Sequence, residues 1–210
     1  MKERPIPFSG DMVQAILEGR KTMTRRPLKP QPPVWERPKG DYSIMEFREY
    51  GKDSGNFRWL GAGLPCLKSP YNRVWRCPYG QPGDRLWVRE TWAKQLGSQL
   101  FQYKASNDQL HGLNKWKSPL FMPRWASRIT LEIVKVRVER LQEITERDAV
   151  CEGMDGHCPL DKMTWNTPRE QFIKLWNFLY IKKPDLQWQA NPWVWMIEFK
   201  LCQNYVKNRE

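Results

Sequence analysis

Hydrophobic and polar residues alternate most clearly over residues 128–139, which we predict to form the longest strand of the protein. Hydrophobic side chains fall on one face as far as Ile133, and the alternation continues from Val134 on the opposite face. A change of face of this kind is typical of a β-bulge or of a sharp bend in a barrel. Weaker strand patterns occur at 4–8, 85–92, 100–105 and 193–200.

Helical spacing of hydrophobic residues indicates two or three helices. Residues 167–179 begin with Thr-Pro-Arg-Glu, which combines an N-cap, a proline at the first helical position and a glutamate three residues after the cap. Residues 10–18 follow Ser9, which is a favourable N-cap. A third, shorter helix is predicted within residues 145–153, where the last residue is a glycine that can close it.

Residues 27–82 break both patterns, because prolines and glycines recur throughout this stretch. We predict one long surface insertion with a hairpin formed by residues 42–47 and 56–60. Loops of this length are usually functional or mobile. A second insertion is predicted at 155–190.

Together these elements predict an α+β fold in a single domain that spans residues 1–210. Several strands are expected to close a small β-barrel, with two or three helices at its flank. The sequence contains no internal repeat and no recognisable interdomain linker.

The composition narrows the choice of partners. Lys and Arg number 35 against 23 Asp and Glu, which gives a formal charge of +12. Such an excess favours polyanions, with nucleic acid first and an anionic membrane surface second. No apolar run is long enough to predict a membrane span, and the N-terminus has no signal-peptide core. Five cysteines, an odd number, argue against a fully paired disulfide framework and favour a reduced, cytoplasmic protein.

No metal and no cofactor is predicted. The five cysteines and two histidines do not show the Cys-x-x-Cys spacing of a zinc ribbon. Ordinary buried thiols are the simpler interpretation of this pattern.

Residues 19–26, Gly-Arg-Lys-Thr-Met-Thr-Arg-Arg, form the strongest candidate site, with four cations and two threonine hydroxyls. They directly follow the first predicted helix. Gly19 falls where a left-handed residue usually closes a helix. The basic segment is therefore expected to leave the helix at a fixed angle.

These residues fit the Gly-x-Lys-x-x-x-x-Arg signature of the ASCH domain, so the chain resembles that family, a relative of the PUA RNA-binding barrel. Residues 83–88 resemble the family's Gly-Asp strand start, and residues 197–199 resemble its closing strand. The long Pro- and Trp-rich insertions resemble the larger versions found in phages and prophages. The resemblance implies a PUA-like β-barrel with a cleft that faces a nucleoside or single-stranded RNA.

One branch of the family consists of small amidohydrolases that deacylate N4-acetylcytidine with a Lys, a Thr and a Glu. Resemblance to that branch implies three catalytic residues in this chain. Lys21 and Thr24 reproduce its Gly-x-Lys-x-x-Thr spacing, and Glu152 begins a Glu-x-Met sequence after a long strand. This chain is much longer than those enzymes, so its insertions can rebuild the cleft.

The residue types themselves fit amide hydrolysis, which needs a nucleophile, a base and an acid for the leaving amine. Thr24 is the nucleophile if a deprotonated Lys21 lies within hydrogen-bonding reach, and Glu152 passes a proton to the exocyclic amine. A free lysine has a pKa of about 10.4, which burial and neighbouring arginines lower. Substrate or phosphate binding is expected from four arginines: Arg20, Arg25, Arg26 and Arg124.

Other interpretations stay open. A basic segment is also typical of a solvated or phosphate-binding surface, Thr24 can bond the local backbone, and Glu152 can simply end a capped helix. The chain would then be a non-catalytic RNA-binding module, and cleavage of RNA is a third function that suits the same surface. Basic residues interleaved with aromatic residues at 73–76 and 122–128 fit RNA stacking, although arginines covering packed Trp rings give the same pattern.

Overall fold

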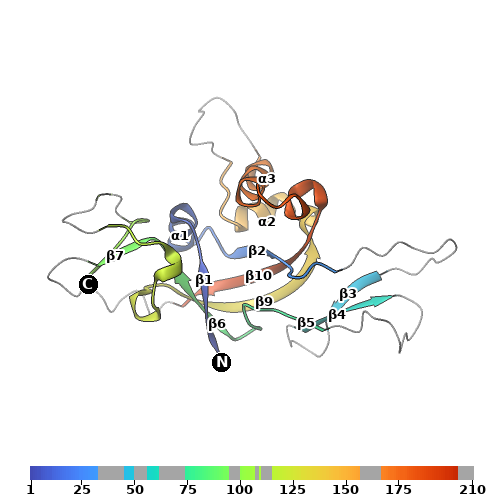
Figure 1. Ribbon diagram of the computed structural model, residues 1–210, viewed down its shortest axis with the longest axis horizontal. Helices are drawn as coiled ribbons and strands as arrows, with labels where there is room; N and C mark the ends of the chain where they lie inside the picture. Colours follow the sequence, from blue (N-terminus) through green and yellow to red (C-terminus); the bar gives the residue numbers. More distant parts are fainter. Residues whose placement is uncertain are drawn as a thin grey trace.

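The computed structural model describes residues 1–32, 45–49, 56–61, 74–94, 100–106, 109, 115–156 and 167–202. Within these ranges the chain is an α+β protein that consists mostly of sheet with a few helices, as the sequence predicts (Figure 1). No helix in these ranges is long and apolar enough to cross a membrane.

Five strands form the main sheet, in the order β1-β6-β9-β10-β2. Their bounds are β1 (Glu3–Pro7), β6 (Arg85–Arg89), β9 (Thr130–Arg140), β10 (Trp193–Leu201) and β2 (Met23–Pro27). β1 runs parallel to β6, and every other neighbouring pair is antiparallel. β9 and β10 are long and curved, and they carry the other elements (Figure 1).

The predicted closed barrel is not confirmed. Among the described residues the ladder of strand pairs has two ends, β1 and β2. A side chain nevertheless links these end strands, because Arg26 Nη2 on β2 donates to the carbonyl oxygen of Pro7 on β1 at 2.7 Å. The sheet is therefore curled enough for the side chain of Arg26 to bridge its two end strands.

The predicted irregularity in the longest strand is confirmed. Glu198 on β10 pairs with Lys135, whereas the next residue, Phe199, pairs with Ile133. Val134 is left without a partner in the register and its side chain is 46% exposed. One extra residue in β9 therefore produces a bulge, which changes the face on which the later hydrophobic residues lie.

The three predicted helices are present as α1 (Gly10–Leu17), α2 (Glu146–Cys151) and α3 (Pro168–Leu179). Thr167 and Glu170 form the predicted reciprocal cap at the start of α3. Short 3-10 turns occur at η1 (Pro119–Phe121), η2 (Arg124–Ala126), η3 (Leu141–Glu143), η4 (Pro184–Leu186) and η5 (Trp188–Ala190).

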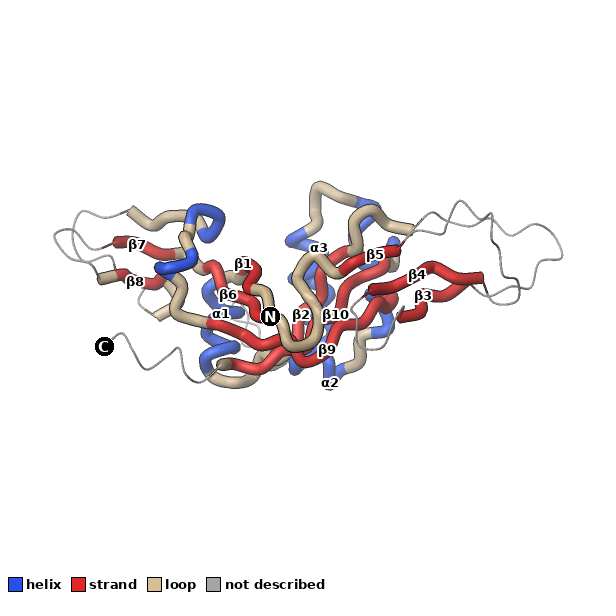
Figure 2. Tube along the Cα trace, turned by 90° about the horizontal axis from the view of Figure 1, so that it is seen from below, coloured by secondary structure: helices blue, strands red, loops and turns tan. Residues whose placement is uncertain are grey.

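Two small sheets lie at opposite ends of the molecule (Figure 2). One contains β3 (Met45–Glu49), β4 (Asn56–Gly61) and β5 (Val74–Arg76), and the other contains β7 (Trp92–Lys94) and β8 (Phe101–Tyr103). β3 and β4 confirm the predicted hairpin where residues are described; residues 42–44 lie outside the described ranges. β5 is absent from the sequence prediction, and the predicted strand 85–92 is divided between β6 and β7.

The apolar core has two main parts. Residues from α1 and from the strands β1, β6, β9 and β10 make the first, which includes Ile6, Ile16 and Ile197. α2 and α3 cover the second, in which Phe172 and Trp176 are buried. The segment predicted as an insertion at 155–190 thus supplies a helix of the core.

Candidate functional site

The basic segment 19–26 is held between α1 and the end of α2 by backbone hydrogen bonds. Gly19 has a φ of +76° and ends α1, as predicted. The Lys21 N–H then donates to the carbonyl oxygen of Ala15, and the Thr22 N–H donates to that of Cys151, both at 2.9 Å. These bonds place the start of β2 directly beside α2 (Figure 1).

Lys21 and Glu152 form a buried ion pair at this junction. Lys21 Nζ lies 2.8 Å from Glu152 Oε2, and the two residues are 3% and 4% exposed. Lys21 Nζ also donates to the backbone carbonyl oxygens of Glu152 at 2.7 Å and of Met23 at 2.8 Å. The structure therefore brings together two of the three residues predicted to be catalytic.

The three acceptors around Lys21 Nζ match the three protons of an ammonium group. A neutral amine has only two protons, so its lone pair would face one of these oxygens. Burial lowers the pKa of Lys21, and the charge of Glu152 acts in the opposite direction. Two effects therefore oppose each other at this site. Burial disfavours the charged form of Lys21, whereas the three hydrogen-bond acceptors favour it.

Arg25 extends the pair into a network with carboxylates of α2 and β9. Its guanidinium bonds Glu139 at 2.8 Å, Asp148 at 3.0 Å and Glu152 at 3.3 Å, and its side chain is 0% exposed. Burial raises the pKa of Glu139, against the nearby charge of Arg25. We predicted a substrate-binding role for Arg25, but its donors are directed to groups of the protein itself.

Thr24 is buried and belongs to the opposite face of β2 from Arg25, because successive side chains of a strand alternate. Its residue partner on β10 is Ile197. Within the described ranges, the Thr24 hydroxyl makes no hydrogen bond to Lys21 or Glu152. The structure thus joins Lys21 to Glu152 but does not join Thr24 to either residue.

The other predicted binding residues lie in separate places. Arg20 is exposed and donates to Glu18 at 2.8 Å and to the carbonyl oxygen of Gly153 at 3.3 Å. Arg124 pairs with Glu3 on β1 at 2.8 Å. Arg26 lies on the Thr24 face of β2, where it borders a pocket. Of these three arginines, Arg26 is the one that lines this pocket.

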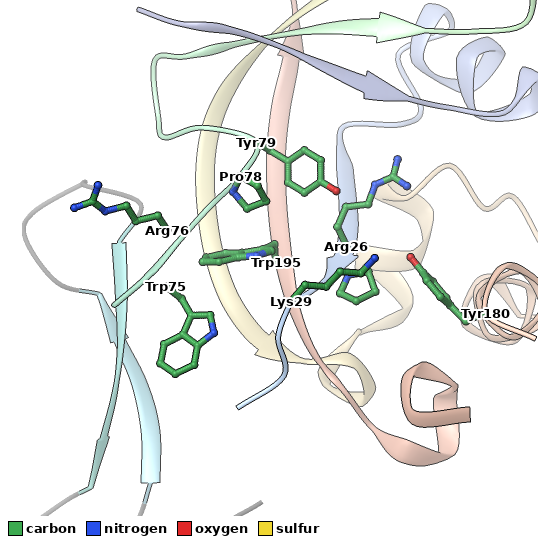
Figure 3. A pocket seen from close by; sticks show the side chains of 9 residues that line it. Arg26, Lys29, Trp75, Arg76, Pro78, Tyr79, Tyr180 and Trp195 are labelled. Atoms are coloured by element: carbon green, nitrogen blue, oxygen red, sulfur yellow. The ribbon is translucent and has the colours of Figure 1, made fainter. Parts of the chain in front are cut away.

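The pocket has a volume of about 290 Å³ and lies where β2, β5, β10 and the turn after α3 meet (Figure 3). Aromatic residues provide much of its wall: Trp75, Tyr79, Tyr180 and Trp195. Arg26 and Trp195 face each other in the β2–β10 register. The sequence prediction included Arg26 and the basic aromatic segment 73–76, but it missed Lys29, Tyr180 and Trp195.

The two basic aromatic segments have different surroundings. In the first, residues 75 and 76 line the pocket, and residue 73 lies outside the described ranges. In the second, Trp125 is 57% exposed and its ring packs against Phe101, with a centroid separation of 5.3 Å. Arg124 lies over the ring of Trp87, 6.0 Å from its centroid.

No cluster of three His, Cys, Asp or Glu residues suited to a metal ion occurs in the described part of the chain. Cys77, Cys151 and Cys202 are free thiols there. Burial raises the pKa of Cys77 to about 11, so this thiol stays protonated near neutral pH. The remaining cysteines and both histidines lie outside the described ranges.

No family model and no curated protein matches the chain. A search of solved structures matches the crystal structure of protein EF3133 from Enterococcus faecalis V583, assigned to the family model DUF984. It is 10% identical, the match covers 100% of this chain and 86% of that one, and the TM-score is 0.43. These values do not identify a shared activity.

Proposed function

We propose that the chain is a hydrolase directed at a nucleoside or RNA, and that it removes an acyl group from the exocyclic amine of cytidine. The observation that carries this proposal is the buried pair of Lys21 and Glu152. Burying two charged groups costs free energy. Burial lowers the pKa of Lys21, and ionisable groups with perturbed pKa values gather at functional sites. The resemblance of residues 19–26 to the ASCH signature supplies the substrate class and the PUA-like barrel.

The proposed reaction assigns one role to each predicted residue. The Thr24 hydroxyl oxygen attacks the acyl carbon, and Lys21, once deprotonated, accepts the hydroxyl proton. The proton that Lys21 accepted passes to the Glu152 carboxylate, with which Lys21 is in hydrogen-bond contact. The C–N bond then breaks, and Glu152 delivers this proton to the leaving amine of cytidine. Water hydrolyses the acyl-threonine ester in the second half of the reaction. This sequence needs a movement that brings the Thr24 hydroxyl within about 3 Å of Lys21 Nζ.

Arg25 has a positioning role in this proposal. Its bond to Glu152 Oε1 leaves Oε2 directed at Lys21, so the carboxylate is fixed between two cations. A fixed carboxylate loses little entropy when it transfers a proton. Binding of substrate falls instead to Arg26, whose guanidinium borders the pocket.

A second candidate function is binding of RNA without catalysis. Two observations favour it: all three Lys21 donors are directed at protein oxygens, and Thr24 has no bond to Lys21 in the described ranges. The network would then anchor α2 to β2, and Arg26 with the surrounding cations would bind phosphates. A ribonuclease would use the same basic surface.

Turnover of N4-acetylcytidine and equilibrium binding of a single-stranded RNA separate these candidates. A hydrolase releases acetate from N4-acetylcytidine. Thr24→Ser, which keeps a hydroxyl, should retain turnover, whereas Thr24→Val, which keeps the shape alone, should lose it and still bind cytidine. Turnover by Thr24→Val at the parent rate would exclude Thr24 as nucleophile. RNA binding by a parent protein that hydrolyses no acylated nucleoside would favour the binding module.

A further inference from the structure

The described residues that line the pocket beside Arg26 carry an excess of positive charge. Three cations line it, Arg26, Lys29 and Arg76, and its lining includes no Asp or Glu. None of the three forms an ion pair within the described ranges. Arg25, one residue before Arg26, binds three carboxylates. Ion pairing is therefore available on this strand, whereas Arg26 and Lys29 have no acidic partner among the described residues.

Two tyrosine hydroxyls are directed at the same end of the pocket. Figure 3 shows the hydroxyls of Tyr79 and Tyr180 and the Lys29 ammonium pointing toward one region beside the Arg26 side chain. Neither hydroxyl has a hydrogen-bond partner in the described part of the chain. Burial raises the pKa of both tyrosines, and the charge of Arg26 opposes this shift in each. Both hydroxyls therefore stay protonated near neutral pH and can donate.

Arg26 itself has donors to spare. One guanidinium nitrogen, Nη2, donates to the carbonyl oxygen of Pro7 at 2.7 Å, which fixes the side chain at the edge of the sheet. The Nε atom is buried and has no partner among the described residues. A guanidinium held in this way is preorganised for an anion with several oxygens, such as a phosphate group.

The remaining wall of the pocket consists mostly of apolar residues. Trp195 lies at its centre, with Pro78 and Trp75 beside it (Figure 3). The Trp75 indole is fixed because its Nε1 donates to the carbonyl oxygen of Pro30 at 3.2 Å. Trp75 and Arg76 belong to β5, so the segment predicted as an insertion supplies this wall. Pro78 is exposed, whereas Trp195 and Trp75 are 2% and 6% exposed, so Pro78 is the apolar surface of this wall that a nucleobase can contact.

We propose that this pocket binds one nucleotide, with its phosphate among Arg26, Lys29, Tyr79 and Tyr180 and its base toward the exposed Pro78. The volume of about 290 Å³ suits a single nucleotide, because it lies at the small end of ligand pockets. The nucleotide is either free or the phosphorylated end of a single-stranded RNA, since both present the same groups. This assignment does not depend on the proposed hydrolysis.

Isothermal titration calorimetry tests the proposal with ligands that carry no acyl group. Cytidine is compared with cytidine 5′-monophosphate, and a short RNA with a 5′-hydroxyl is compared with the same RNA carrying a 5′-phosphate. We expect the phosphate to strengthen binding at least about tenfold in one or both pairs, as charge-assisted hydrogen bonds typically do. A preference confined to the RNA pair identifies an RNA end as the ligand.

Variants locate the phosphate. Lys29→Gln and the double variant Tyr79→Phe, Tyr180→Phe should each reduce the phosphate preference at least about fivefold. Lys200→Gln, at an exposed lysine on β10 that does not line the pocket, is the matched control and should keep the preference. Equal binding of phosphorylated and unphosphorylated ligands, or no binding of any, would overturn the proposal. Retention of the full preference in both pocket variants would overturn it as well.

Discussion

Lys21 and Glu152 are joined through two different groups of the same glutamate. The Lys21 ammonium donates to the Glu152 carboxylate at 2.8 Å and to the Glu152 backbone carbonyl oxygen at 2.7 Å. The second bond holds the end of α2 against the start of β2, whichever side chain is present at position 152. Substitution of Glu152 therefore removes a charge while leaving part of the junction intact.

Glu152→Gln should destabilise the protein, because Lys21 and Arg25 would lose a carboxylate that they share. We expect the free energy of unfolding to fall by about 3 kcal/mol, which is typical when one partner of a buried ion pair is removed. Urea unfolding followed by circular dichroism measures the change.

The control for this prediction is Glu132→Gln. Glu132 pairs with Lys200 at 3.0 Å on the surface, where ion pairs contribute less than about 1 kcal/mol. If both variants lose the same small amount, the Lys21–Glu152 pair does not support the fold as we describe it.

Gly153→Ala should also disturb the junction. Gly153 has a φ of +94°, and a Cβ there would lie 3.1 Å from Ala15 Cβ and 3.3 Å from Lys21 Cβ. Left-handed backbone alone costs an alanine about 1–2 kcal/mol, and the crowding adds to this cost. The melting temperature and the free energy of unfolding report the loss.

Gly83→Ala isolates the contribution of crowding. Gly83 has a φ of +85°, but a Cβ there would meet nothing within 4 Å. Gly153→Ala should therefore be the more destabilising of the two variants. If both variants lose the same free energy of unfolding, the residues around Gly153 move apart to make room for the Cβ with little loss of stability.

The local features of this fold were predictable from the sequence. A cap, a proline and a glutamate within four residues define the start of α3, and the change of alternation after Ile133 defines the bulge. Both signals lie in neighbouring residues. β2 was not predicted as a strand, because Thr24, Arg25 and Arg26 are polar and pair with β10 from far along the chain.

The site was predictable only in part, for the same reason. The resemblance pointed to Lys21 and Glu152, but nothing near Arg25 in the sequence indicates that carboxylates from β9 and α2 converge on it. The pocket combines side chains from four separate segments, so its aromatic wall follows from strand register and from the path of the chain after α3.

Stability at alkaline pH should respond to Lys21. Burial lowers its pKa from the ordinary value of 10.5, so the unfolded chain binds this proton more tightly than the folded protein does. Between the folded-state pKa and 10.5, the contribution of Lys21 to the free energy of unfolding rises with pH. It is fully present above 10.5 and is lost as the pH falls through the folded-state pKa.

Urea unfolding at several alkaline pH values tests this prediction, with the parent compared with Lys21→Met. The free energy of unfolding of the parent should rise relative to that of Lys21→Met as the pH rises, by at most about 1.4 kcal/mol per pH unit. Lys200→Met, which removes an exposed lysine, is measured in the same way as the control. If the stability of the parent relative to Lys21→Met falls as the pH rises, the Glu152 charge has a larger effect on the pKa of Lys21 than burial has.

The most direct test of the proposed hydrolase is turnover of N4-acetylcytidine by Lys21→Arg. Arginine keeps the positive charge but is not deprotonated near neutral pH, so it cannot accept the Thr24 proton. Binding of cytidine by the variant and its melting temperature show whether the site and the fold persist, and Lys200→Arg is the matched control. We predict that Lys21→Arg binds cytidine and has no turnover, while Lys200→Arg keeps the parent rate. Turnover by Lys21→Arg at the parent rate would contradict a catalytic role for Lys21.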